Sequence, residues 1–111
     1  MLKFMVVLTR REGTSALDFR RYFKEVHEPL AKQIHGLKRY VQNFVVDDAR
    51  RKRPAWDAII ELYFDNWTSM ESAWASAEGR ASTEDLTAFA DVERSGWSVV
   101  EEAVIVRGKF E

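Results

Sequence analysis

The sequence predicts an α+β fold with the order β-α-β-β-α-β, the ferredoxin-like arrangement of a four-stranded antiparallel sheet with helices. Two observations carry this prediction. Segments rich in β-branched and aromatic residues alternate with segments whose apolar residues recur every three or four positions, and capping residues precede the helical segments. The chain has 111 residues, of which 46% are hydrophobic, so we expect residues 1–111 to form a single domain around one core.

The first expected strand covers residues 2–8, which are apolar at even and odd positions alike, as in a strand covered on both faces. Residues 15–18 then have the [ST]-x-x-[DE] pattern that begins many helices. The apolar residues that follow are spaced by 3, 1, 3 and 4, which predicts one buried helical stripe. That stripe consists of Phe19, Tyr22, Phe23, Val26 and Leu30.

Pro29 interrupts this helix, because proline has no backbone donor and its ring clashes with the preceding turn. We therefore expect an end or a kink near residues 27–28 and a short second helical turn at 30–34. Gly36 is a typical stop signal after that turn. A second strand is expected at 37–46.

The second half of the chain predicts a hairpin loop at 47–54, a third strand at 56–64 and a last strand at 98–106. Asp65 and Asn66 can cap a helix whose apolar residues are Trp67, Met70, Trp74 and Ala77. Gly79 is expected to interrupt it. Residues 82–85 repeat the capping pattern, and we expect them to begin an extra helix before the final strand.

Composition excludes several function classes. The 17 Lys and Arg residues nearly balance the 18 Asp and Glu residues, which is not typical of a nucleic-acid-binding protein. The chain has no cysteine and only two histidines, so we expect no disulfide, no thiolate-ligated metal site and no His-rich metal site. No apolar segment is long enough for a signal peptide or a membrane span, so we expect a cytoplasmic protein with no membrane partner.

The predicted sheet has more apolar surface than its own helices can cover. Helices on one face would leave the other face in water, yet the first and third strands carry large apolar residues at both parities. A contiguous apolar patch of this kind usually marks an interface. We therefore predict a homodimer in which the two sheets pack against each other.

His27 is the strongest candidate for chemistry, because it lies at the break before Pro29, where a side chain can point into a cleft. An imidazole there can transfer protons near neutral pH. The alternative is a histidine that caps the helix C-terminus through the helix dipole. His35, beside Gly36, is expected at the surface.

Other polar candidates lie on the middle strands. Tyr40 could orient a carbonyl or an enolate through its hydroxyl. Asp57 and Glu61 are four residues apart on one strand, hence ~13 Å apart and too distant to act as a carboxylate pair. The alternatives for these two are a polar rim or a role as buried partners of backbone and arginine groups. Trp56 could line the mouth of a cavity, and the basic residues 50–53 are expected at a solvated hairpin tip.

The segment from Phe19 to Asn43 resembles the EthD family of small dimeric α+β-barrel proteins. The matching features are His27-x-Pro29-Leu30, Gly36-Leu37-x-x-Tyr40, Asn43 and Trp56-Asp57-x-x-x-Glu61-x-x-Phe64. The resemblance implies a ferredoxin-like protomer whose sheet packs against its mate and encloses a cavity in each half. It also implies that His27 acts at that cavity and that Tyr40 lies in it.

These observations together predict a protein that binds a small, largely apolar organic compound and performs acid/base chemistry on it without a cofactor. Isomerisation, dehydration or decarboxylation is expected, with His27 as acid/base and Tyr40 orienting an oxygen. The alternatives are an oxidative accessory protein or cofactor-free monooxygenase, as the resemblance suggests, and a non-catalytic binding dimer. The residues expected to contact substrate are Asn43, Phe44, Trp56, Asp57, Glu61 and Leu62.

Overall fold

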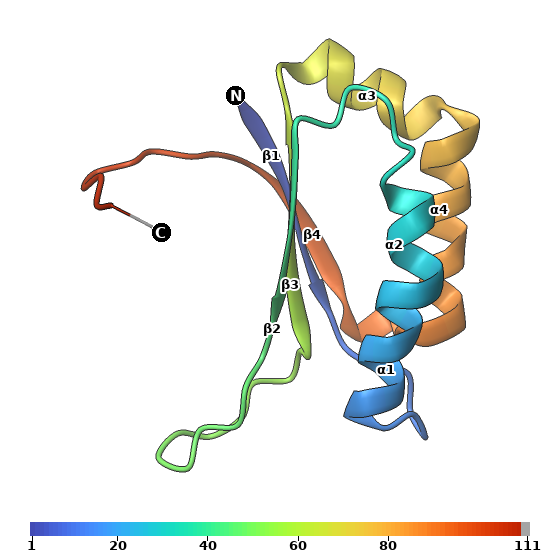
Figure 1. Cartoon of the computed structure of the whole chain (residues 1–111), viewed down its shortest axis with the longest axis vertical. Coiled ribbons are helices and arrows are strands. Elements are labelled where there is room, and N and C mark those ends of the chain that lie inside the picture. The colour runs from blue at the N-terminus through green and yellow to red at the C-terminus, as the bar shows by residue number, and fades with distance from the viewer. Residues whose placement is uncertain (110–111) are drawn as a thin grey trace.

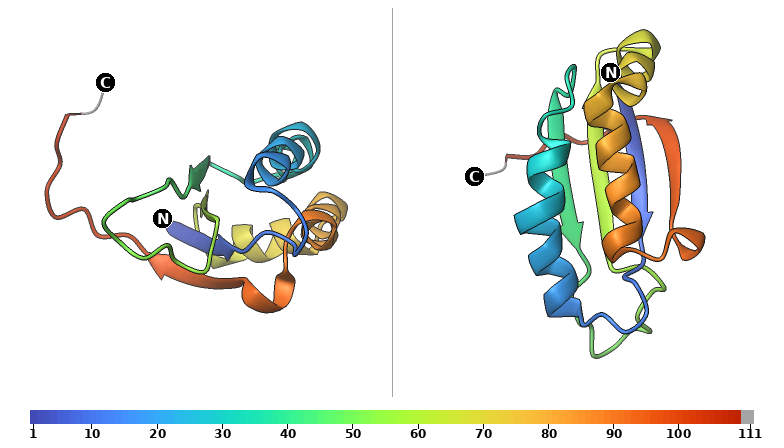
Figure 2. Two further views of the ribbon diagram at one scale, coloured as in Figure 1. Left: turned by 90° about the horizontal axis from the view of Figure 1, so that it is seen from below. Right: turned by 90° about the vertical axis from the view of Figure 1, so that its right-hand side faces the viewer.

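The computed structural model describes residues 1–109, and it has one four-stranded sheet with all helices packed on the same face (Figure 1). The elements in chain order are β1 (Leu2–Leu8), α1 (Ala16–Tyr22), a π-helical segment (Phe23–His27), α2 (Glu28–Ala31), β2 (Arg39–Phe44), β3 (Ala58–Phe64), α3 (Trp67–Ala75), α4 (Ala77–Phe89), a 3₁₀ turn (Val92–Arg94) and β4 (Gly96–Glu101). The α1–α2 rod and α4 lie side by side over the sheet (Figure 2).

The sheet confirms the predicted ferredoxin-like topology. Its strand order is β2-β3-β1-β4, and every neighbouring pair is antiparallel. Strand β1 is central and pairs with both β3 and β4; Val6, for example, lies opposite Ile60 on one side and Trp97 on the other. Among residues 1–109, no helix has the length and apolarity that crossing a membrane requires.

Three strands are shorter than predicted. Strand β3 begins at Ala58 rather than at residue 56, because Asp57 ends the loop by donating its N–H to the Leu8 carbonyl at 2.7 Å. Strand β4 covers 96–101 rather than 98–106, since its only neighbour begins at Leu2, which already pairs with Glu101. Residues 104–106 are exposed and extend away from the sheet (Figure 1). Strand β2 likewise covers 39–44 instead of 37–46.

The helix N-termini follow the sequence signals at two of three sites. The Ser15 side chain accepts a hydrogen bond from the Asp18 N–H, and Asn66 accepts one from the Ser69 N–H. The third expected cap, at 82–85, lies instead within α4. Ser76 caps that helix by accepting from the Gly79 N–H, so the break precedes the expected position at Gly79.

The predicted end or kink near residues 27–28 is a change of hydrogen-bond pattern, and the second helical turn is at 28–31 instead of 30–34. Pro29 offers no N–H to a carbonyl in the preceding turn, and the chain widens into a π turn there, in which the Glu28 N–H donates to the Phe23 carbonyl. A π turn contains one residue more than an α turn, so the residues after it face a different side of the helix than the 3.6-residue period predicts. Val26, expected on the buried stripe, is 41% exposed, whereas His27 is only 6% exposed.

The core lies between the sheet and the helices. Alternate residues of β3, from Ala58 to Phe64, are buried beneath the helices, as the alternation predicted. Phenylalanine side chains from three helical segments and the sheet fill this layer, and the most buried are Phe19, Phe23, Phe64 and Phe89.

Gly79 allows α3 and α4 to meet at a sharp corner, and replacing it is expected to destabilise the fold. A Cβ atom at Gly79 would lie 2.1 Å from the Ala73 carbonyl oxygen, so the backbone of α3 would have to shift. We expect Gly79→Ala to lower the free energy of unfolding by about 2–3 kcal/mol, as overpacking does. Urea unfolding monitored by circular dichroism would measure it. Gly108→Ala, where a Cβ meets nothing within 4 Å, is the control and should leave stability unchanged.

Candidate functional site

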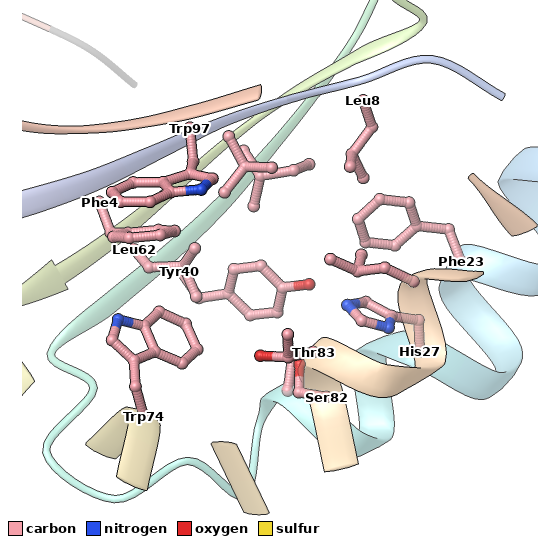
Figure 3. Close-up of a pocket in the computed structure, with 14 residues that line it drawn as sticks. Phe4, Leu8, Phe23, His27, Tyr40, Leu62, Trp74, Ser82, Thr83 and Trp97 are labelled. Carbon is pink, nitrogen blue, oxygen red and sulfur yellow. The ribbon is translucent and has the colours of Figure 1, made fainter. Parts of the chain in front are cut away.

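A cavity of about 310 Å³ lies between the helix-covered face of the sheet and the helices (Figure 3). Its size is at the lower end of the range for small-molecule sites. The walls are mostly apolar and aromatic, with few polar groups. The lining residues are Phe4, Val6, Leu8, Phe23, His27, Ala31, Tyr40, Ile60, Leu62, Trp74, Ser82, Thr83, Leu86 and Trp97.

His27 forms part of the cavity wall, where the π turn directs it inward. Its Nδ1 lies 3.0 Å from Oδ2 of Asp85 on α4, and its ring packs against the rings of Phe23 and Phe89. Burial lowers the pKa of His27 below its ordinary value of 6.5, and the contact with Asp85 opposes this only in part. His27 is therefore neutral at pH 7 and able to accept a proton.

Asp85 is the hydrogen-bond partner of His27 that sequence analysis missed, because residues 82–85 resembled a helix cap. Its Oδ1 accepts a 2.7 Å hydrogen bond from the Tyr22 hydroxyl, which raises the pKa of that tyrosine. The sequence feature that could have identified Asp85 is its position four residues before Phe89, which places it on the buried stripe of α4. A carboxylate on an apolar stripe needs a polar partner.

Tyr40 lies across the cavity from His27, and Figure 3 shows its hydroxyl directed toward the imidazole ring. The Gln42 side chain donates a 3.1 Å hydrogen bond to this hydroxyl. Burial raises the pKa of Tyr40 to about 12. The phenol therefore stays protonated at neutral pH, and it can donate a hydrogen bond to a ligand oxygen.

Aromatic residues form the end of the cavity away from His27. Phe4 stacks on Trp97 at 5.3 Å and contacts Trp74 at 4.9 Å between ring centroids. The Trp74 Nε1–H is buried, and it has no hydrogen-bond partner within residues 1–109. Trp56, the tryptophan predicted to line the cavity mouth, is instead exposed on the hairpin side and outside the cavity wall.

Of the other residues predicted to contact substrate, one lines the cavity and one lies beside it. Leu62 lines the cavity. Phe44 lies outside the lining, where it contacts the Phe23 ring and the guanidinium of Arg20. His35 is exposed, as predicted, and lies 3.4 Å from the Ser72 hydroxyl.

Asn43 and Glu61 lie on the opposite face of the sheet, so the predicted contact with a substrate in this cavity does not hold for them. Glu61 accepts hydrogen bonds of 2.8 Å from Lys3 Nζ and 3.0 Å from Asn43 Nδ2, and Lys3 also donates to Glu102 at 2.8 Å. Burial alone would lower the pKa of Lys3, but its hydrogen bonds to the two glutamates raise it. These residues form a charged network away from the cavity.

Asp57 also lies outside the cavity and has a structural role at the hairpin. Its Oδ2 accepts a 2.8 Å hydrogen bond from the Arg10 N–H, and its Oδ1 lies 3.2 Å from the Arg53 guanidinium. The basic residues 50–53 are exposed at the hairpin tip, as predicted. In the described part of the chain, no group of three or more His, Asp or Glu side chains is arranged to hold a metal ion.

The Lys3–Glu61 contact predicts that stability falls in acid. Hydrogen bonds from Lys3 and Asn43 hold the pKa of Glu61 below its ordinary 4.5, so ionised Glu61 stabilises the fold above pH 4.5. This contribution is lost as the pH falls through the lowered pKa. We expect Glu61→Gln to be less stable than the parent at pH 7 and to lose less stability between pH 6 and pH 3. Urea unfolding across that range would measure both, and parallel pH curves would contradict the prediction.

Comparison with known proteins identifies the family. The EthD domain model matches residues 11–93. An uncharacterized 11.0 kDa protein of Rhodococcus erythropolis, from the thcB–thcC intergenic region, is 31% identical over 90 residues, which are 81% of this chain and 84% of that protein.

Three solved structures share the fold. An ethyl tert-butyl ether D (EthD) family protein of Bacillus halodurans C-125 has a TM-score of 0.80 and 24% identity, and the match covers 93% of this chain and 99% of that one. A dimeric ferredoxin-like protein of Bacteroides fragilis has a TM-score of 0.67 and 17% identity, and the match covers 91% of this chain and 95% of that one. SnoaB, a cofactor-independent oxygenase of Streptomyces nogalater, has a TM-score of 0.66 and 11% identity, and the match covers 96% of this chain and 97% of that one. The family-model match, over most of the chain, confirms the resemblance noted in the sequence: the chain belongs to the EthD family.

Proposed function

We propose that this protein binds a small, largely apolar organic compound in the cavity and catalyses proton transfer on it without a cofactor. Isomerisation, dehydration and decarboxylation belong to this reaction class. The observation that carries the proposal is a neutral, buried imidazole opposite a protonated phenol in a cavity that is otherwise apolar. A base and a hydrogen-bond donor at opposite walls are the two groups that enolisation requires.

The reaction follows from the protonation states of the two residues at neutral pH: His27 is neutral and Tyr40 is protonated. Neutral His27 accepts a proton from a carbon atom next to a carbonyl group; the electron pair of that C–H bond forms a C=C bond, and the π pair of the C=O bond moves onto the oxygen. The Tyr40 hydroxyl stabilises the resulting enolate by donating a hydrogen bond to this oxygen. In a substrate with a C=C bond conjugated to the enolate, return of the proton from His27 to the far carbon of that system re-forms the C=O bond and completes an isomerisation. One positioned acid/base of this kind accelerates a reaction by roughly 10²–10⁴-fold.

The cavity also restricts the size of the ligand. Since a water molecule occupies about 30 Å³ in the liquid, a volume of about 310 Å³ accommodates on the order of ten non-hydrogen atoms. Apolar walls favour a compound with a single polar end that meets His27 and Tyr40, and the aromatic residues Phe4, Trp74 and Trp97 would contact its apolar end.

A second candidate function is cofactor-free oxygenation, which begins with the same proton removal. Here the carbanion would transfer an electron to dioxygen instead of recovering a proton. The fold shared with the oxygenase SnoaB favours this alternative. The two reactions differ in their need for dioxygen, so anaerobic conditions distinguish them.

Deuterium exchange tests the proposed proton transfer with a panel of compounds in place of a single substrate. The protein is incubated in D₂O, under nitrogen, with lactones and enolisable cyclic ketones of about ten non-hydrogen atoms, and loss of the α-proton signal is followed by ¹H NMR. We expect exchange with at least one compound, reduced about 10²-fold or more in His27→Ala because the base is gone. Tyr40→Phe should also slow it.

His35→Ala is the matched control, since it removes the other histidine, which is exposed, and it should exchange at the parental rate. Circular dichroism would verify that each variant is folded. Equal exchange in His27→Ala and the parent would contradict the proposal. Binding without exchange in any variant would indicate a non-catalytic binding protein, and product formation only in air would favour the oxygenase.

We propose further that two copies of the chain associate through the sheet face that the helices leave uncovered. Met5, Val7, Val41 and Ile59 are on that face, because they alternate with the residues beneath the helices. This apolar patch lies beside the charged network on the same face, and an apolar patch on an uncovered sheet face usually packs against a second layer. The related protein of Bacteroides fragilis is described as dimeric, which supports the association of two copies here.

A charge in the middle of the uncovered face is expected to prevent this association. Ile59 lies on the central strand pair, opposite Val7 and Asn43, so Ile59→Lys would place an ammonium group at the interface. We expect the parent to sediment as a dimer at micromolar concentration and Ile59→Lys as a folded monomer. Leu17→Lys, on the exposed side of α1, is the control and should remain dimeric. A monomeric parent would contradict the proposed dimer.

A further inference from the structure

Tyr22, Asp85 and His27 form a continuous chain of hydrogen bonds at the cavity wall. The Tyr22 hydroxyl donates to Oδ1 of Asp85 at 2.7 Å, and the other carboxylate oxygen lies 3.0 Å from Nδ1 of His27. The side chains of Asp85 and His27 are largely buried, with 14% and 7% exposed. Both oxygens of this carboxylate therefore have a partner, as a buried charge requires.

The π turn is what allows two residues of one helix to reach the same carboxylate. In an α-helix, residues five apart differ by 5 × 100°, which places them about 140° apart around the axis. In the π-helical segment, hydrogen bonds join residues five apart, as between Glu28 and Phe23, and such residues come to lie on nearly the same side. Tyr22 and His27 are five apart, and both face α4.

We propose that Asp85 is a positioning residue that fixes His27 in one tautomer, with Tyr22 holding Asp85 in place. An ionised carboxylate can only accept hydrogen bonds, so the nitrogen that faces Asp85 must carry the hydrogen. In neutral His27 this leaves the Nε2 atom without a hydrogen and with its lone pair free. Nε2 is then the atom that accepts the proton of the substrate. The catalytic consequence rests on the proposed function, whereas the tautomer does not.

The aromatic neighbours of His27 strengthen this assignment. The rings of Phe23 and Phe89 lie 5.3 Å and 5.0 Å from the imidazole ring, so they restrict its rotation without offering a hydrogen bond. Asp85 is the only hydrogen-bond partner of the His27 ring within residues 1–109. A single acceptor at Nδ1 therefore determines the tautomer.

Nitrogen NMR of ¹⁵N-histidine-labelled protein tests the tautomer without any substrate. The chain has only two histidines, so His35→Ala identifies the signals of His27. We expect parental His27 at pH 7.5 to show a protonated Nδ1 and an unprotonated Nε2. In Asp85→Asn the side-chain amide can donate a hydrogen bond to Nδ1, and we expect the hydrogen to move to Nε2. Tyr22→Phe should leave the Nδ1–H form dominant, with faster exchange of that hydrogen with solvent.

Turnover separates this inference from the proposed function. With a compound found in the deuterium-exchange screen, Asp85→Asn should lower kcat about 10²-fold or more and change KM less than threefold, because the apolar contacts with the ligand remain. Glu84→Gln, the exposed neighbouring residue, is the control and should keep the parental kcat and His27 signals. Thermal unfolding would verify that the variants are folded.

Three results would overturn the inference: a mixture of tautomers in the parent, an unchanged His27 spectrum in Asp85→Asn, or parental kcat in that variant while His27→Ala is inactive. The last result would leave His27 as the base and remove only the role of Asp85. The expected spectra together with unaltered exchange in His27→Ala would support the tautomer assignment and contradict the proposed function instead.

Discussion

The packing of aromatic rings around Phe89 sets the distance between the α1–α2 rod and α4. The cavity depends on that distance, because residues of both helices form part of its wall. Phe19, Tyr22 and Phe23 of the first helical rod lie 5.4, 5.1 and 5.2 Å from the Phe89 ring of α4, close enough for favourable ring contacts. These rings fill one end of the space between helices and sheet. The cavity lies beside this cluster, and Phe23 is both a member of the cluster and part of the cavity wall.

Burial of polar groups beside this aromatic cluster is costly unless every group has a partner. An unpartnered buried hydroxyl or carboxylate destabilises a fold by roughly 1–3 kcal/mol or more. At the site, the carboxylate of Asp85 satisfies both Tyr22 and His27, and Gln42 satisfies Tyr40. These hydrogen-bonded side chains are therefore compatible with a stable core, and the π turn supplies the geometry for two of the contacts.

The alternation of apolar residues predicted the fold well, and the site only in part. The order of the elements along the chain and the caps at Ser15 and Asn66 depend on local patterns, so the sequence indicated them. The inward direction of His27 depends on a change of helix register before a proline, and a 3.6-residue period cannot represent it; that period placed Val26 inside instead. Asp85 was missed for a related reason, because its partners come from a helix about sixty residues earlier in the chain.

Asp57, which the sequence analysis expected to contact substrate, affects the site through the register of strand β3. Strand β3 directs Ile60 and Leu62 into the cavity and Glu61 into the charged network of the opposite face. A slip of one residue would exchange these sets, because side chains alternate between the faces of a strand. Asp57 supports the observed register at the first residue before β3, where it bonds to the backbone at the end of β1 through both its N–H and its carboxylate. An aspartate outside the cavity thus contributes, together with the pairing of β3 to β1 and β2, to the choice of side chains that enter the cavity.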